Sequence, residues 1–216
     1  MSPLLRRLPR LAIRGVAALG RLLAPDYCAA CDAPLCAGET FCDDCGCCQE
    51  PPAEVALGAC AAGAYTPPLS TAILRMKFGQ RTDLADRLSV LLPHLELASS
   101  TLVVPVPSHV TRLVERGFNP PALLARGWCR RLGAEFAPSL LVRCRQTPHQ
   151  SALPASERAS NVAGAFIAHA SAAGRQAVLL DDVVTTGATL GACRRALYAA
   201  GVVHVTVVVL AATPLV

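Results

Sequence analysis

Residues 178–190, VLLDDVVTTGATL, decide the fold of this 216-residue chain. An apolar run typical of a buried strand leads into the adjacent acids Asp181 and Asp182, and a loop rich in threonine and glycine follows. A helix pattern then covers residues 188–200 and ends at Gly201. The order of strand, acids, loop and helix predicts an α/β fold built on a parallel sheet.

The loop after the acids has the composition of a phosphate site. Backbone N–H groups and threonine hydroxyls at the start of a helix form an environment that holds anions. Asp181 and Asp182 would then face a ribose or a Mg²⁺ ion beside that phosphate. The alternative is an ordinary turn in which a threonine caps the helix. Because paired acids are costly to place without a ligand or partner, the pattern favours a sugar phosphate.

A cysteine cluster near the N-terminus predicts a metal site. Seven of the eleven cysteines lie between residues 28 and 48, and four of them form two C-x2-C pairs. These four could present thiolates to one tetrahedral zinc ion: Cys28, Cys31, Cys42 and Cys45. A four-cysteine shell leaves no position for water, so the zinc would be structural; a disulfide cluster or a redox pair is the alternative.

The remaining cysteines divide into two groups. Four have no assigned role: Cys36, Cys47, Cys48 and Cys60. Cys48 could replace Cys45 as a metal ligand, or Cys48 and Cys60 could contribute to an incomplete second site. Three others lie in apolar surroundings and are predicted to be small buried hydrophobes: Cys129, Cys144 and Cys193.

Composition narrows the class of protein. Hydrophobic residues make up 53% of the chain, yet no stretch of 18 or more residues is continuously apolar, so we expect no membrane span and a cytoplasmic protein. The basic segment 1–24 is interpreted as an amphipathic helix, with a targeting segment as the alternative. The net charge of +5 suits anionic ligands, and Lys77 is the sole lysine. Aromatic residues, at 4%, are too few for an extended stacking surface on single-stranded nucleic acid.

Further helices and strands place a second loop near the acids. Helices are predicted at residues 69–78, with apolar positions 69, 73, 74 and 78, at 83–92, and at 120–132, where Asn119 would cap the helix. Strands are predicted at 101–106 and 202–211, the latter joined to the acid-bearing strand by a right-handed crossover. Because ligands gather at the carboxyl ends of parallel strands, the loop at 107–109 would form the opposite wall of the site.

Six motifs, taken in order along the chain, resemble a known family. They are RMKFG at 75–79, VPVP at 104–107, RGFN at 116–119, R-x-R-x-T-x-x-Q at 143–150, ER-x-x-N at 157–161 and DDVVTTGAT at 181–189. Together with the cysteine cluster they resemble the ComF family, bacterial proteins associated with competence and DNA uptake. After the helix predicted at 1–24, the resemblance implies a zinc ribbon at 25–62 and a domain of the type I phosphoribosyltransferase fold at 63–216.

The same resemblance implies a site for 5-phosphoribosyl 1-pyrophosphate (PRPP) with Mg²⁺. It assigns Asp181 and Asp182 to the ribose hydroxyls. It assigns four loop residues to the 5-phosphate: Thr185, Thr186, Gly187 and Thr189. The candidates for the pyrophosphate are Pro107, Ser108, Lys77, Arg116 and Arg158. Purine-salvage relatives place an acid where Thr185 stands, so purine salvage is disfavoured.

Two function classes remain open from the sequence. One is a phosphoribosyltransferase with an unknown acceptor, in which Mg²⁺ and arginine neutralise the leaving pyrophosphate. The sequence shows no evident general base, which keeps open a non-catalytic module that senses PRPP or a nucleotide and docks on a competence helicase or on DNA. A DNA-binding protein with a degenerate enzyme fold is disfavoured because the acid pair is present.

Overall fold

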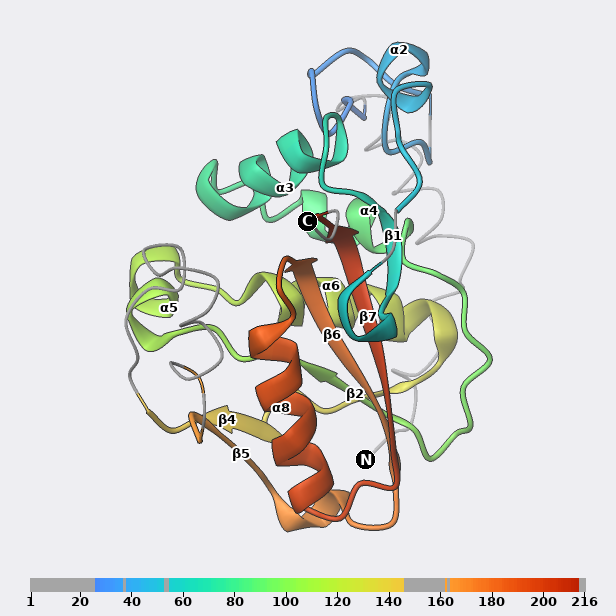
Figure 1. Cartoon of the computed structure of the whole chain (residues 1–216). Helices are drawn as coiled ribbons and strands as arrows, with labels where there is room; N and C mark the ends of the chain where they lie inside the picture. Colours follow the sequence, from blue (N-terminus) through green and yellow to red (C-terminus); the bar gives the residue numbers. More distant parts are fainter. Residues whose placement is uncertain (1–25, 37, 53–54, 146–161, 163, 214–216) are drawn as a thin grey trace, which may run out of the picture.

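A five-stranded parallel sheet forms the centre of the molecule (Figure 1). The computed structural model describes residues 26–213 except 37, 53–54, 146–161 and 163. The strands, in their order across the sheet, are β1 (Cys60–Ala64), β7 (His204–Ala212), β6 (Gln176–Val184), β2 (Leu102–Pro105) and β3 (Glu135–Phe136). All four neighbouring pairs are parallel. The predicted α/β class with a parallel sheet is therefore confirmed.

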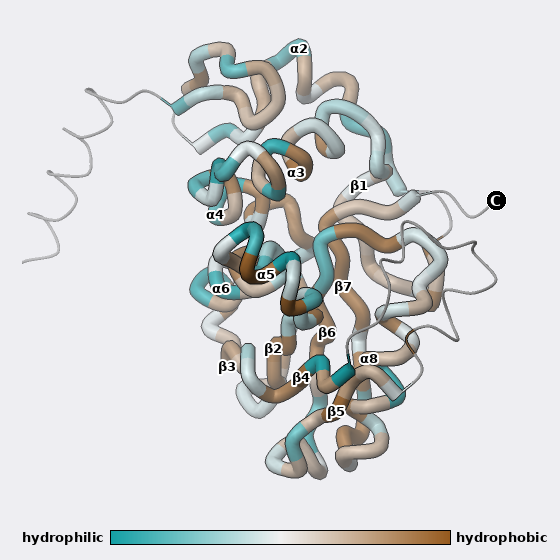
Figure 2. The backbone as a smooth tube through the Cα atoms, turned by 90° about the vertical axis from the view of Figure 1, so that its left-hand side faces the viewer, coloured by the Kyte–Doolittle hydropathy of each residue, from teal (hydrophilic) through white to brown (hydrophobic). Residues whose placement is uncertain are grey.

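Helices cover both faces of the sheet, which gives three layers (Figure 2). One face carries α8 (Ala188–Ala199), and the other carries α3 (Leu69–Phe78), α4 (Leu84–Ser89) and α6 (Pro120–Leu132). Side chains of β6 alternate between two apolar clusters: Leu179 packs on the α8 side and Leu180 on the α6 side. A strand buried on both faces needs a continuous apolar run, and this is the run that precedes Asp181.

Local sequence signals explain where the helices begin and end. Two prolines open α6, and Gly133 closes it with a left-handed φ of 68°. Helix α8 starts directly after Gly187, whose φ is 74°, and ends at Ala199, one residue before the predicted end. A short helix, α5 (Val110–Arg116), follows β2 and contains no buried residue. In the part of the chain that the structure describes, no helix has both the length and the apolar character to cross a membrane.

Two smaller parts flank the sheet. The cysteine-rich segment, at the top of Figure 1, contains helix α2 (Asp43–Gly46) and a bridge between Tyr27 and Pro34. The short helix η1 (Ala56–Gly58) leads from it into β1, which joins the sheet and runs across the boundary predicted between residues 62 and 63. An antiparallel pair, β4 (Leu141–Arg143) and β5 (Phe166–Ala168), packs beside α8 and is followed by the short helix η3 (Ala170–Ala172).

Several local predictions need correction. The acids do not follow β6 but lie within it, because the strand continues to Val184. Helix α3 has the predicted bounds, but it buries Leu69 and Ile73 while leaving Leu74 and Phe78 exposed. The buried face of α3 instead includes Ala72 and Met76. Helix α4 is shorter than predicted, Leu84–Ser89.

The predictions for the buried cysteines hold in two cases. Cys129 and Cys193 are buried, but Cys144 is exposed because it follows the edge ribbon β4. The helix predicted for residues 1–24 lies outside the described residues.

Candidate functional site

The two acids of β6 lie three and two residues before the carboxyl end of the central strand, with their side chains on opposite faces of the sheet. Asp182 is 7% exposed and faces α3, whereas the charge of Asp181 acts on Cys193 of α8. Desolvation and the neighbouring Asp182 raise the pKa of Asp181 to about 8, and Lys77 opposes that rise. Two adjacent carboxyl groups in such surroundings favour the binding of a cation or of hydroxyl groups.

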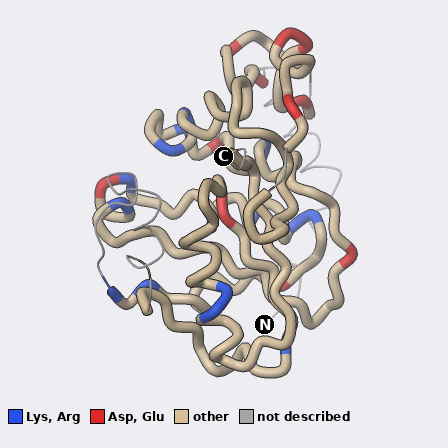
Figure 3. Tube along the Cα trace, viewed as in Figure 1, with Lys and Arg blue, Asp and Glu red and all other residues tan. Residues whose placement is uncertain are grey.

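Lys77 joins α3 to this acid pair. Its Nζ donates to Oδ1 of Asp182 at 2.8 Å, and both side chains are largely buried. Figure 3 shows the acids of β6 in red, with basic residues of α3 and α5 in blue nearby. The structure therefore brings together Lys77 and Asp182, which the sequence analysis assigned to one site from positions 105 residues apart.

The loop 185–187 connects the acids to α8. Thr185 and Thr186 are exposed, Gly187 is buried, and Thr189 lies in the first turn of α8. Gly187 occupies the N-cap position with a left-handed backbone and offers no side-chain cap. The alternative interpretation, in which a threonine caps this helix from the N-cap position, is therefore wrong. The N-cap residue of α8 therefore contributes no capping side chain, as expected of a helix start that binds an anion.

Gly187 is also held in place from outside the loop. A Cβ at this position would lie 3.1 Å from Cγ of Leu57 and 3.2 Å from Cβ of Ala56. The turn after the cysteine-rich segment thus packs against the loop. The sequence analysis missed this contact, because no local pattern links residues 56–57 to position 187.

The opposite wall is the loop after β2, and Asn119 braces it. Ser108 Oγ donates to Oδ1 of Asn119 at 2.7 Å, and Nδ2 of Asn119 donates to the carbonyl of Val106 at 3.0 Å. Asn119 occupies the N-cap position of α6 but makes no side-chain bond to that helix, so the predicted capping role is wrong. Its side chain instead fixes the loop that contains Pro107 and Ser108.

The arginine candidates differ in their placement. Arg116, at the end of α5, is half-buried, and desolvation lowers its pKa while the carboxylate of Asp182 raises it. Arg116 therefore lies within electrostatic range of the acids. Arg158 falls in 146–161, outside the described residues. His109 caps α5 by accepting from the N–H of Thr111.

The four predicted metal ligands converge. The Sγ atoms of Cys28, Cys31, Cys42 and Cys45 all lie within 4.8 Å of one another, and those of Cys31 and Cys42 are 3.7 Å apart. Tetrahedral zinc with Zn–S bonds of about 2.3 Å requires sulfur atoms separated by about 3.8 Å. The four side chains therefore fit a structural metal ion.

The thiols of this cluster also influence one another's pKa values, as expected for side chains that converge on one point. Desolvation raises the pKa of Cys28, but backbone N–H groups of Cys42, Cys31 and Ala30 outweigh it and lower that pKa to about 6. Desolvation and the neighbouring thiols raise the pKa of Cys45. Four thiolates at this distance need a cation between them. Among the described residues this is the sole such cluster, and Cys47 and Cys48 lie outside it with their own Sγ atoms 3.9 Å apart.

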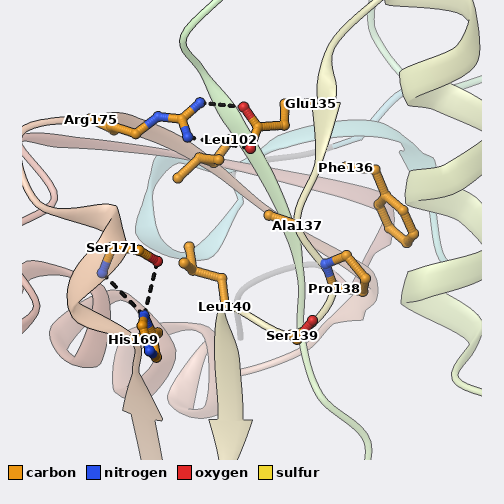
Figure 4. A pocket seen from close by; sticks show the side chains of 10 residues that line it. All are labelled: Leu102, Glu135, Phe136, Ala137, Pro138, Ser139, Leu140, His169, Ser171 and Arg175. Atoms are coloured by element: carbon orange, nitrogen blue, oxygen red, sulfur yellow. Dashed lines mark hydrogen bonds and ion pairs between the residues drawn. The ribbon is translucent and has the colours of Figure 1, made fainter.

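A separate hollow of about 420 Å³ lies at the amino-terminal edge of the sheet (Figure 4). Leu102 and Leu140 form part of its apolar wall, and the Arg175–Glu135 ion pair and His169 lie at its rim. The acids of β6 lie towards the other end of the same strands. None of the predicted site residues lines this hollow.

Comparison with known proteins shows close relatives. The chain is 33% identical over 183 residues to the DNA utilization protein YhgH of Escherichia coli K12, covering 76% of this chain and 80% of that protein. It is 31% identical over 195 residues to Competence protein F of Haemophilus influenzae, covering 84% and 82%. No family model matches the chain.

Solved structures give a more limited likeness. A glutamine PRPP amidotransferase from Bacillus subtilis shares 18% identity with a TM-score of 0.37, and the match covers 59% of this chain but 25% of that one. An allosteric regulatory enzyme of purine biosynthesis shares 20% identity with a TM-score of 0.38 over 60% of this chain and 25% of that one. The chain thus spans about a quarter of these proteins. From the sequence relatives, each more than 30% identical over three quarters of the chain or more, this protein belongs to the ComF family.

Proposed function

We propose that this protein binds PRPP together with Mg²⁺ at the carboxyl edge of β6. The observation that carries the proposal is that Asp181 and Asp182 are followed directly by a loop that leads into α8, with Gly187 rather than a capping side chain at the N-cap position. The acids supply ligands for ribose hydroxyls and a cation, and the loop supplies N–H and hydroxyl donors for a 5-phosphate. Lys77 and Arg116 supply positive charge for the pyrophosphate.

The walls of the site support this arrangement of the ligand. The β2 loop is braced by Asn119, so its backbone is already ordered for contact with an anion. Ser108 is part of that loop, and Lys77 reaches the acids from the α3 side. In a proposed complex the pyrophosphate lies between these elements, and the 5-phosphate lies at the start of α8.

The relatives suggest the process that this site serves. Their names associate them with DNA utilization and competence. We propose the same association for this chain, with the cysteine-rich segment, stabilised by zinc, as a docking surface for a helicase or DNA. A non-catalytic sensor of PRPP or a nucleotide is the alternative to an enzyme, because the acids of β6 are assigned to ribose and cation binding and no other described residue is assigned as a general base.

Thermal unfolding in the presence of ligands tests the proposal. A ligand at 100 times its Kd stabilises the folded state by about 2.7 kcal/mol, which for a protein of this size raises the Tm by roughly 5–10 °C. We expect that shift with PRPP and Mg²⁺, a smaller one with ribose 5-phosphate and none with ribose. An unchanged Tm with millimolar PRPP and Mg²⁺ would contradict the proposal.

Product analysis separates the enzyme from the sensor. In a transfer reaction the bond from C1 of the ribose to pyrophosphate breaks, and pyrophosphate leaves with the electron pair. A nucleophile forms the new bond to C1 and gives its proton to solvent. Pyrophosphate released in proportion to an added nucleophile identifies an enzyme. Tight binding of PRPP with no release across nucleophile classes identifies a sensor.

A further inference from the structure

Phe78 is a large aromatic side chain left in solvent at the edge of the candidate site. It is the last residue of α3 and is 70% exposed, although the same helix buries Ile73 and Met76. The preceding residue, Lys77, reaches Asp182 at 2.8 Å. Helix α3 ends directly after the ring, at Gly79, where a Cβ would lie 2.8 Å from the carbonyl oxygen of Arg75. The ring also contacts Arg116, whose charge interacts with that of Asp182, so Phe78 lies beside the groups of the candidate site.

Arg116 holds this ring from one side. Its guanidinium carbon lies 4.9 Å from the ring centroid of Phe78, within the range of a cation–π contact. Arg116 comes from α5, which follows the braced β2 loop, so the contact joins two elements that border the site. A guanidinium stacked on one side restrains the ring while much of its surface stays accessible, as its exposure shows.

The residues around Phe78 favour a ligand that is planar and also carries negative charge. Phe78 offers a flat apolar surface, and Lys77 and Arg116 place positive charge beside it. Every nucleobase has a π-face that stacks on such a ring, and its attached phosphate and ribose are anionic and polar. An apolar protein segment would bury the ring as well, but it would offer no negative charge to the guanidinium of Arg116 beside the ring.

We propose that Phe78, positioned by Arg116, is the stacking surface for a nucleobase whose ribose phosphate occupies the β6–α8 site. This inference rests on the proposed function and names the class of acceptor or effector: a nucleotide base. The residue determines specificity and performs no bond-making step. It also gives a reason for an exposed phenylalanine at a position where the apolar pattern of α3 predicts burial.

Calorimetric titration of the full chain with Mg²⁺ tests the inference. The ligands are PRPP, ribose 5-phosphate, adenosine 5′-monophosphate and uridine 5′-monophosphate. In the unmodified protein we expect the nucleotides to bind more tightly than ribose 5-phosphate, because stacking on one ring is worth roughly a 5- to 150-fold gain in affinity. In Phe78→Leu that gain is lost, so the ratio of nucleotide affinity to ribose 5-phosphate affinity falls towards one.

A matched control is Tyr198→Leu. Tyr198 is also an exposed helical aromatic residue, 46% exposed, but it lies at the far end of α8 from the loop. We expect the control to keep the ratio of the unmodified protein. Phe78→Trp adds a reporter, because nucleotide stacking quenches an exposed indole, whereas Trp128 is fully buried and gives a constant background.

The outcomes distinguish this inference from the proposed function. If PRPP binds but nucleotides bind no better than ribose 5-phosphate, the stacking role is overturned and the PRPP site stands. The same holds if Phe78→Leu weakens ribose 5-phosphate and nucleotides equally. If folded protein binds none of the four ligands, both the site and the stacking surface are overturned. If an apolar peptide, and no nucleotide, quenches Phe78→Trp, the surface belongs to a protein partner.

Discussion

The Nζ of Lys77 lies 2.8 Å from Oδ1 of Asp182, and this ion pair ties the end of α3 to the central strand β6. Both side chains are at most 18% exposed. Removing one partner of a buried pair leaves an uncompensated charge, which costs about 3–5 kcal/mol. The pair therefore contributes to the stability of the protein as well as to the candidate site.

Replacing Lys77 tests this role. We expect Lys77→Met to lower the free energy of unfolding in urea by about 3 kcal/mol at neutral pH, because Asp182 loses its counter-charge beside Asp181. Arg130→Met is the control, since it breaks the ion pair with Asp86, in which both side chains are more than half exposed. That control should unfold at nearly the unmodified urea concentration. Equal effects of the two substitutions would show that the Lys77 pair is not buried in solution.

The raised pKa of Asp181 makes stability depend on pH. Its carboxyl has an ordinary pKa of 3.8 and a folded-state pKa of about 8. Between these values the folded state holds a proton that the unfolded state has lost, so this group makes stability fall as the pH rises from about 4 to 8. We expect Asp181→Asn to flatten the slope of unfolding free energy over pH 5 to 8. An identical slope in the two proteins would mean that Asp181 is ionised throughout.

We expect any side chain at position 187 to destabilise the folded protein. The φ of 74° at Gly187 is strained for alanine, and a Cβ would press on Leu57 at 3.1 Å. Gly133→Ala is a matched control, because φ there is 68° with no neighbouring atom within 4 Å. We expect the control to cost about 1 kcal/mol and Gly187→Ala about 2–3 kcal/mol in thermal unfolding. Equal costs would mean that the Leu57 contact adds nothing.

Arg87 of α4 clamps the cysteine-rich segment. Its guanidinium donates to the carbonyls of Tyr27 at 2.5 Å, Glu39 at 2.8 Å and Thr40 at 3.2 Å. We expect the unmodified protein to bind close to one zinc ion per chain, and Arg87→Met to release it to a chelator several-fold faster. Arg126→Met, an exposed arginine of α6, serves as control. Zinc release at one rate in all three proteins would contradict the clamp.

The sequence predicted the parts of the fold that depend on local pattern. Strand β6, the loop and α8 follow from an apolar run, a glycine and a helix period that lie within 25 residues of one another. The convergence of the four cysteines follows from spacing alone, because each C-x2-C pair can turn back on one metal ion.

The missed features depend on contacts between distant residues. Asn119 has the residue type and position of a helix cap, yet its side-chain amide makes hydrogen bonds to the loop after β2. That loop lies close to Asn119 only in the folded protein. Phe78 falls on an apolar period, but α3 turns a different stripe towards the sheet. The contact of Leu57 with Gly187 joins positions 130 residues apart, and no local signal encodes it.

Calorimetric titration with PRPP in the presence of Mg²⁺ is the most direct test of the central claim. The unmodified protein is compared with a double variant, Asp181→Asn with Asp182→Asn, and with Glu135→Gln, a carboxylate that pairs with Arg175 at the opposite edge of the sheet. The account predicts binding by the unmodified protein and by Glu135→Gln, and at least a tenfold loss of affinity, about 1.4 kcal/mol, in the double variant. Equal affinity in all three folded proteins would contradict it.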